Sequence, residues 1–285
     1  MLRSRCVRVR VRFAVVVVIA CGKPDPTPMP IVAAPVADAA VACAARRVAL
    51  PAGLVGERWT IAATPIAGEP CIDVVRADLA ALALRAFTDP KRRTAPAWRD
   101  GEHLIAVTNA GMFHDDNNPV GLVIDRGNVR GVDNPKFGGF VAWDPVAAGD
   151  PPVISVGSSC AGFDLAALRV RYRSLVQGYR LLDCDGHALP WKDPKQYSAV
   201  ALAVDRAGRL VFLHARGAVT MGELSVSLAG HDLAGAIFLE GGPEASLIAG
   251  DLSLIGSYET GFVENDDNRE PWALPNVLGL VRRQP

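Results

Sequence analysis

The sequence predicts an α+β fold, in which a single domain combines a mixed, strand-rich β-sheet with a few packed helices. Apolar runs of four to eight residues, bounded by glycine or polar residues, are typical of buried strands, and they recur along most of the chain. Glycine-containing turns at residues 126–127 and 206–208 are typical of hairpins. Many strands joined by hairpins, with sparse helices, favour an α+β fold over a purely helical one.

The expected elements follow from these runs in chain order. Residues 221–228 form the clearest helix, because Thr220 is a suitable N-cap and Glu223 stands at the spacing of a capping box. Residues 78–87 fit a helix as well as a strand, since Leu79, Leu82 and Phe87 would share one helical face. The expected strands are residues 59–64, 72–76, 82–87, 104–108, 121–124, 128–132, 139–143, 153–156, 175–182, 199–204, 210–215, 236–239 and 277–281.

Residues 1–20 have the pattern of an export signal. Five arginines precede an apolar run at residues 13–20, which is too short for the roughly 20 residues that cross a bilayer. Cys21 follows Val-Ile-Ala, which resembles a bacterial lipobox, and we expect this cysteine to carry lipid. Ordinary secretion is the alternative. The expected location is the bacterial cell envelope, with the membrane contacted through the N-terminal lipid on its periplasmic or extracellular face.

Residues 21–45 are predicted to be a tether, because four prolines fall within residues 22–30 and alanine and valine dominate the rest. The folded domain is expected at residues 46–285. The whole chain carries 30 basic and 30 acidic side chains, and loss of the five arginines of the signal leaves the mature protein mildly acidic. That balance argues against nucleic acid as a partner, since such proteins need a clustered basic surface.

Four further cysteines, Cys43, Cys71, Cys160 and Cys184, remain in the exported part of the chain. An even number in an exported protein predicts disulfides, for which three connectivities are possible. We favour Cys43–Cys71 and Cys160–Cys184, because each closes a modest loop between neighbours in sequence. The alternative is that some are buried free thiols. The sequence has no Cys-x-x-Cys pair, so no structural zinc is expected.

Two strands are expected to deliver polar groups to an edge of the fold. The apolar run 236–239 ends in Glu240 followed by Gly241 and Gly242, and residues 104–108 run into Asn109 and then residues 110–114. Glycine lets the backbone approach a ligand where a side chain would obstruct it. A strand followed by an ordinary turn is the simpler interpretation of either segment alone.

Together with further segments in the same order, these residues resemble the phosphodiester glycosidase family. The matching segments are residues 109–113, 119–122, 177–180, 239–242 and 274–278, and the resemblance covers roughly residues 58–283. It implies a strand at residues 82–87. It also implies a hydrolase that cleaves the glycosidic bond of a sugar-1-phosphodiester in an envelope or extracellular glycan. No cofactor is expected and no metal ligand is assigned, while the question of a bound metal is left open.

The resemblance also implies roles for individual residues. The family has Asp where this chain has Glu240, which we place at the anomeric carbon with Asn109 assisting catalysis. An arginine that family members carry before the strand at 199–204 is absent, and Arg180 would take its place, with Lys192 or Lys195 as weaker candidates. The residues expected to bind substrate are Gly111, Phe113, His114, Gln177, Gly178, Arg180, Gly241 and Gly242. The alternative function is a non-catalytic glycan-binding or assembly lipoprotein of the same fold, and the oligomeric state is left open.

The lipid anchor is testable by substitution. Cys21→Ser should abolish incorporation of labelled lipid and release the protein from membranes that have been washed with high salt, because salt screens charge attraction but does not remove inserted acyl chains. Lipid labelling that persists in the variant would contradict the assignment.

Overall fold

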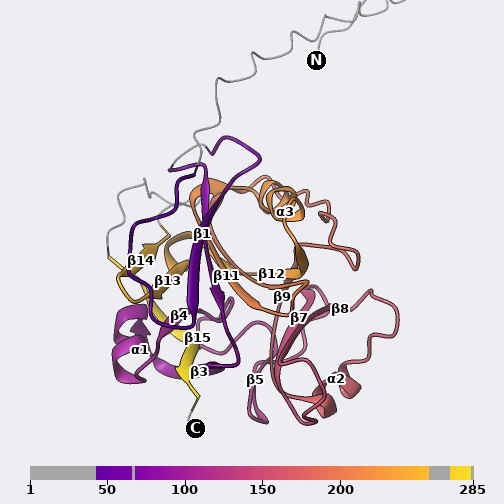
Figure 1. Ribbon diagram of the computed structural model, residues 1–285. Helices are drawn as coiled ribbons and strands as arrows, with labels where there is room; N and C mark the ends of the chain where they lie inside the picture. The colour runs from indigo at the N-terminus through magenta and orange to yellow at the C-terminus, as the bar shows by residue number, and fades with distance from the viewer. Residues whose placement is uncertain (1–42, 66–67, 257–269, 284–285) are drawn as a thin grey trace, which may run out of the picture. The chain divides into compact units, whose positions relative to one another are not determined.

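The computed structural model describes residues 43–65, 68–256 and 270–283 (Figure 1). These residues belong to one compact unit, Ala40–Pro285. The predicted signal peptide, Cys21 and the predicted tether up to residue 42 lie outside the described residues. Among the described residues, no helix is long and apolar enough to cross a membrane.

Ten described strands form the larger sheet, sheet A. Their order is β1-β2-β11-β10-β12-β9-β5-β6, and β7 pairs with both β8 and β9. The strands are β1 (Leu54–Thr60), β2 (Cys71–Ala77), β5 (Val123–Asp125), β6 (Asn128–Arg130), β7 (Gly138–Pro145), β8 (Val153–Gly157), β9 (Tyr172–Arg180), β10 (Tyr197–Asp205), β11 (Leu210–Val219) and β12 (Leu233–Gly241).

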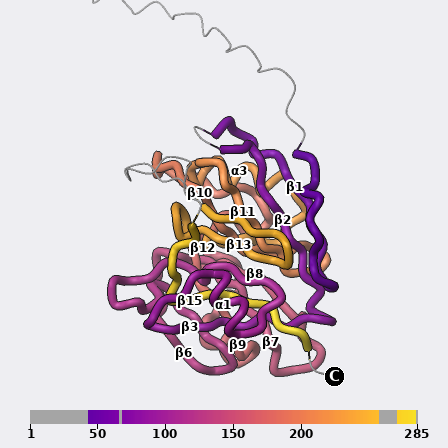
Figure 2. The backbone as a smooth tube through the Cα atoms, turned by 90° about the vertical axis from the view of Figure 1, so that its left-hand side faces the viewer, coloured from indigo at the N-terminus to yellow at the C-terminus, as the bar shows by residue number. Residues whose placement is uncertain are grey.

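The remaining five described strands form sheet B, in the order β14-β13-β4-β15-β3. They are β3 (Leu82–Thr94), β4 (Ala106–Asn109), β13 (Ser246–Ala249), β14 (Leu252–Ile255) and β15 (Ala273–Arg282). Figure 2 shows β3 and β15 side by side, and these two strands pair over most of their length.

The described strands differ from the single mixed sheet that the sequence predicted, because they form two sheets in which every pairing is antiparallel. The physical reason is that several strands are covered on both sides. All nine residues of β10 are buried, and such continuous apolar strands resemble those of a parallel sheet in sequence.

The core lies on both sides of sheet A. One cluster joins it to sheet B and includes Val200 and Phe212 from sheet A with Leu247 and Leu278 from sheet B. A second cluster covers the other face and includes residues of α3 (Met221–Ala229). The capping box predicted for α3 is present, with the Thr220 side chain accepting from the Glu223 backbone and the Glu223 carboxylate accepting from the Thr220 backbone.

Sequence analysis missed two helices and the hairpin of β13 and β14. Helix α1 (Ala95–Gly101) begins after Thr94, whose hydroxyl accepts from Ala97 N, and helix α2 (Leu165–Arg171) begins after Asp164, whose carboxylate accepts from Ala166 N. Both N-caps are readable in the sequence. Each helix has only seven residues, which is too short for an apolar periodicity to be recognised.

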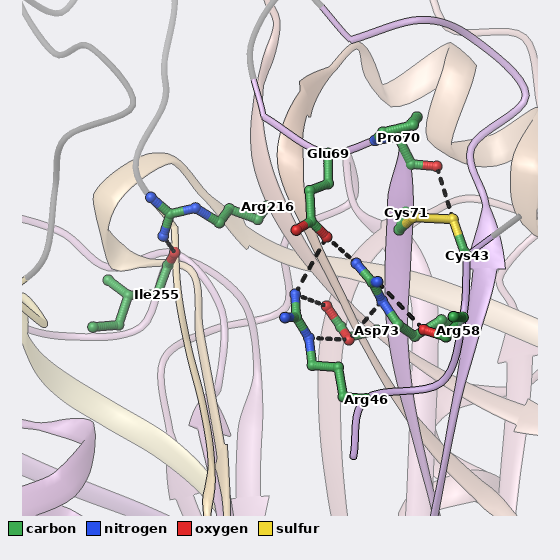
Figure 3. Close-up of polar contacts among 10 residues, drawn as sticks. Cys43, Arg46, Arg58, Glu69, Pro70, Cys71, Asp73, Arg216 and Ile255 are labelled. Atoms are coloured by element: carbon green, nitrogen blue, oxygen red, sulfur yellow. Dashed lines mark hydrogen bonds and ion pairs between the residues drawn. A yellow bond between two sulfur atoms is a disulfide. The ribbon is translucent and has the colours of Figure 1, made fainter. Parts of the chain in front are cut away.

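Both favoured disulfides are present. Cys43–Cys71 ties the segment before β1 to the first residue of β2, and Cys160–Cys184 joins the loop after β8 to the segment after β9. Beside the first disulfide, Arg46 donates to the carboxylate of Asp73 at 2.7 and 3.0 Å (Figure 3). Arg58 lies 3.1 Å from the same carboxylate. The N-terminal segment of the domain is therefore held to sheet A by a covalent bond and by ion pairs.

His214 of β11 is buried beside this ion-pair cluster, directly opposite Asp73 of β2. Its Nε2 lies 3.3 Å from Ala245 O, while its Nδ1 has no partner among the described residues. Burial is the main cause that lowers the pKa of His214 from 6.5 to about 4, so the ring is neutral near pH 7. This neutrality argues against the role of proton donor that a histidine at the end of a strand could otherwise play.

The depressed pKa predicts a specific loss of stability in acid. Between pH 6.5 and pH 4, His214 is mostly protonated in the unfolded chain but mostly neutral in the folded protein. The unfolded state therefore binds more protons, and the free energy of unfolding falls as the pH is lowered. The fall should amount to about 2 kcal/mol between pH 7 and pH 5. Urea unfolding of wild type and His214→Gln at both pH values measures it, since the variant should lose about 2 kcal/mol less. The exposed His187→Gln is the control, and an equal loss in wild type and His214→Gln would contradict the prediction.

Candidate functional site

A cavity of about 620 Å³ lies on the face of sheet A that carries α3, and Glu240 forms part of its wall. It is lined by side chains from sheet A, from α3 and from three connecting segments. The lining residues are Arg92, Met112, Phe113, Asp115, Val120, Tyr179, Trp191, Asp193, Lys195, Tyr197, Met221, Phe238, Glu240, Gly241 and Glu244.

A bulge in β12 accompanies the arrival of Glu240 at this cavity. Phe238 and Glu240 both line the cavity, although their partners in β10, Ala201 and Val200, are neighbours whose side chains project to opposite faces. The pairing of β12 with β10 shifts register here, since Val200 is opposite Glu240 but Ala201 is opposite Phe238. The extra residue forms a bulge, a device that frequently redirects side chains next to functional sites.

The glycines after Glu240 are required by the backbone. A Cβ on Gly241 would lie 2.7 Å from the Tyr197 ring and 2.9 Å from Ser198 O. Gly242 has a φ of +67°, which favours glycine, and it begins the short 3₁₀ helix η1 (Gly242–Glu244). The Gly241 N–H donates to Glu240 Oε1 at 3.2 Å. The motif therefore holds a carboxylate at the end of a strand while the chain turns away sharply.

Aromatic rings form much of the cavity wall. The rings of Tyr179 and Trp191 meet edge to face with their centroids 5.3 Å apart. The ring centroids of Tyr197 and Phe238 are 5.6 Å apart. The indole N–H of Trp191 is buried and has no partner among the described residues. Aromatic faces beside polar groups suit the apolar C–H faces and the hydroxyls of a sugar ring.

The charges around the cavity are mostly negative. Four lining carboxylates, those of Asp115, Asp193, Glu240 and Glu244, face two lining cations, Arg92 and Lys195. The Arg92 guanidinium lies 4.7 Å from the centre of the Phe113 ring and donates to Asn117 Oδ1. Arg92 and Lys195 are therefore the lining groups that could contact an anionic part of a ligand.

Among the residues predicted from sequence, Glu240, Gly241 and Phe113 line this cavity, as does Lys195, one of the weaker candidates for the missing arginine. Asn109 does not line it; its side chain is buried at the end of β4, where Oδ1 accepts from Ser246 N at 3.3 Å. The Asn109 Nδ2 has no partner among the described residues. His114 lies in the loop that also carries Phe113, and its backbone N–H donates to Asn118 O. Gly111, with a φ of +116°, makes the turn between β4 and this loop.

The amide of Gln177 is occupied by four hydrogen bonds to protein. Oε1 accepts from the backbone N–H groups of Leu122 and Asn134 at 3.0 and 2.9 Å, and Nε2 donates to Asp133 Oδ1 and Asn134 O at 2.8 and 2.9 Å. Its neighbour Gly178 allows the backbones of β9 and β12 to approach closely, because a Cβ on residue 178 would lie 2.3 Å from Phe238 O. In this structure both residues fasten β9 to its surroundings.

Arg180 lies away from Glu240, against the Cys160–Cys184 disulfide. It donates to Ser159 Oγ at 2.7 Å and to the two sulfur atoms at 3.0 and 3.1 Å. Burial lowers its pKa from the usual value. Arg180 lines a separate cavity of about 210 Å³, so the structure does not bring it together with Glu240, Gly241 and Phe113.

Several cavity residues were missed by sequence analysis. Trp191 could have been noticed. It lies between Pro190 and Pro194 in a polar segment, where no expected strand or helix explains a large aromatic side chain. Arg92 gave no signal, because it stands in a charged run that is typical of an exposed surface. It adopts a positive φ of 31°, which only the fold reveals.

One group of potential metal ligands occurs among the described residues. Ligand atoms of Asp183, Asp185 and His187 lie within 4.8 Å of one another. The Asp183 carboxylate already accepts the backbone N–H groups of Asp185 and His187 at 2.9 Å, which is the ordinary geometry of an Asp-containing turn. These contacts account for the cluster without an ion.

Comparison with known proteins identifies the family. The sequence model of the phosphodiester glycosidase family matches residues 102–281. A solved structure of a hypothetical protein from Synechocystis is similar, with a TM-score of 0.58 and 14% sequence identity, over 81% of this chain and 62% of that protein. The catalytic domain of zebrafish N-acetylglucosamine-1-phosphodiester alpha-N-acetylglucosaminidase, described as auto-inhibited by its pro-peptide, gives a TM-score of 0.59 and 14% identity, over 84% of this chain and 87% of that domain.

No curated protein matches the chain. At 14% identity the two structural similarities concern the fold alone, and this chain spans less than two thirds of the Synechocystis protein. The family match is broader in the sequence, since it runs from the end of α1 to the end of β15 and takes in both Asn109 and Glu240. Because that match covers more than half of the chain, the protein belongs to the phosphodiester glycosidase family.

Proposed function

We propose that the protein is an exported, lipid-anchored hydrolase of the bacterial cell envelope that cleaves the glycosidic bond of a sugar-1-phosphodiester. The observation that carries this proposal is Glu240, which stands at the end of a buried strand in the wall of an aromatic-lined cavity. Family membership supports the reaction class. The two disulfides support an oxidising compartment outside the cytoplasm.

The reaction breaks the bond between the anomeric carbon and the phosphate oxygen. The bonding electrons leave with the phosphate, water adds to the anomeric carbon, and the products are a free sugar and a phosphomonoester. The transition state resembles an oxocarbenium ion, so a carboxylate beside the anomeric carbon stabilises the developing positive charge. Glu240 is the group that we assign to this position.

The remaining cavity residues support binding. A sugar ring against Trp191 and Tyr179 would bury its apolar face, and Lys195 and Arg92 would supply positive charge to the phosphate. Phosphate is a good leaving group as an anion, so a strong general acid matters less here than in an ordinary glycosidase. Asn109 is separated from the cavity, and we assign it a positioning role through its hydrogen bond to Ser246 N.

A second candidate function is a glycan-binding or assembly lipoprotein without catalysis. Two observations favour it: the lining carboxylates outnumber the lining cations, and Arg180 contacts a disulfide rather than the cavity. Both features weaken the recognition of a phosphate but leave the recognition of a neutral sugar intact.

Glu240→Gln should separate the two functions. The substitution keeps the size of the side chain and removes its charge, so kcat on a sugar-1-phosphodiester should fall by about 100-fold or more while the thermal melt changes little. Asp115→Asn removes a charge from the same cavity and should change kcat much less. The assay follows sugar release from a panel that begins with methyl esters of N-acetylglucosamine 1-phosphate and other sugar 1-phosphates. Full activity in Glu240→Gln would refute its role, and binding without turnover by wild type would favour the lipoprotein function.

Trp191 should determine affinity rather than rate. Trp191→Ala removes an aromatic face worth about 1 kcal/mol, so KM or the sugar dissociation constant should rise by roughly five- to tenfold with little change in kcat. Trp191→Phe should retain most of the affinity. Trp272→Ala, at an exposed tryptophan that does not line the cavity, is the control. An unchanged KM in Trp191→Ala would remove this residue from the substrate site.

A further inference from the structure

A second cavity, of about 300 Å³, combines an arginine cluster with a buried tryptophan. None of its lining residues lines the cavity of Glu240. Arg85 of β3, Arg126 after β5, Arg282 at the end of β15 and Arg283 all contribute to its wall, and Trp143 of β7 lies among them. The lining residues therefore come from strands of both sheets.

Not all of the arginines in this cluster are neutralised by ion pairs within the protein. Arg85 forms a bidentate pair with Asp125, with contacts of 2.6 to 3.1 Å, which ties sheet B to sheet A. Arg126 is only 3.7 Å from the same carboxylate. Among the residues that the structure describes, Arg282 and Arg283 make no ion pair, although Arg283 Nε donates to two backbone carbonyls.

The lining carboxylate does not cancel this excess. Asp144 is the only acidic residue in the described wall of the cavity, and it lies 3.5 Å from Arg173 Nη1. Arg85 and Arg126 share Asp125, and Asp144 pairs with Arg173, so Arg282 and Arg283 are left without a described acidic partner. Guanidinium groups on separate segments that converge on one cavity are typical of oxyanion recognition, because their planar N–H donors match pairs of oxygen atoms.

Trp143 provides an independent observation. The residue is 2% exposed and lies in the core between the two sheets, yet its indole N–H has no hydrogen-bond partner among the described residues. A buried donor that remains unpaired costs about 1–3 kcal/mol. Trp143 lines the cavity, so a ligand oxygen that reached this N–H after a local adjustment of the wall would remove that cost.

We propose that this cavity is a second ligand site, which binds the tetrahedral oxyanion of a phosphate group through Arg126 and Arg282, with the Trp143 indole as a further donor. Arg85 is paired with Asp125 and forms part of the wall, while Arg283, whose Nε donates to the carbonyls of Leu79 and Leu82, adds positive charge to the site. The site is separate from the hydrolytic cavity and does not depend on the function proposed for Glu240.

The test uses the indole N–H resonances of the ¹⁵N-labelled full mature chain at pH 7, with Trp143→Phe to assign the Trp143 signal. Inorganic phosphate is titrated against sodium chloride at matched ionic strength, and dimethyl phosphate is titrated separately to distinguish a phosphodiester from free phosphate. The Trp143 resonance should shift saturably with one or both phosphates and not with chloride. The Trp191 resonance reports the other cavity, so the two sites are monitored independently.

Arg126→Gln combined with Arg282→Gln should weaken the phosphate affinity at least about tenfold, because two charge-assisted contacts are removed. Arg47→Gln with Arg169→Gln, at two exposed arginines, removes the same charge elsewhere and should leave the affinity unchanged. The single variants Arg126→Gln and Arg282→Gln provide the measurement if the double variant melts early. The proposal is overturned if the Trp143 resonance does not shift saturably, if chloride shifts it equally, or if the affinity survives the loss of both arginines.

Discussion

The close approach of β9 and β12 is the constraint on which the candidate site depends. The two strands pair over only two positions, Ile237 with Arg180 and Phe238 with Tyr179. No side chain fits at Gly178, since its Cβ would lie 2.3 Å from Phe238 O. Because paired residues of antiparallel strands project to the same face, this crossing places Tyr179 beside Phe238. The bulge in β12 lies between Phe238 and Glu240, and both residues line the cavity. The aromatic wall thus depends on one glycine-dependent contact between backbones, and the carboxylate depends on the bulge that follows it.

The same constraint explains why Arg180 is not in the cavity. Neighbouring residues of a strand project to opposite faces, so a β9 that presents Tyr179 to the cavity must turn Arg180 the other way. There the guanidinium fills the space beside the Cys160–Cys184 disulfide. The side-chain amide of Gln177 holds β9 in position relative to residues 122–134 through four hydrogen bonds. Part of the family-like segment at residues 177–180 is thereby accounted for by folding rather than by chemistry.

Local patterns predicted much of the fold and a smaller part of the site. Most strands were recognisable as apolar runs, and both disulfides and the capping box of α3 were predicted. The hairpin of β13 and β14 was missed, although Gly250 with a φ of +57° makes its turn. The division into two sheets could not be predicted, because strand partners far apart in sequence are chosen by packing. Glu240 could be found from its strand and glycines, whereas Trp191 and Arg92 reach the cavity from connections without a periodic pattern.

The distribution of charge between the two cavities constrains what each can bind. Under the proposed function, a phosphodiester entering the cavity of Glu240 would meet four carboxylates and two cations, and at short range in a partly dry site this repulsion is weakly screened by salt. Its phosphate would therefore have to lie close to Lys195 or Arg92, which would place the sugar nearer to the aromatic wall. The cavity at Trp143 has the opposite balance, with four arginines and one carboxylate in its wall, which favours an anion. If the protein binds a polymer with several phosphates, the proposed second site would hold one phosphate without competing for the residues assigned to the scissile one.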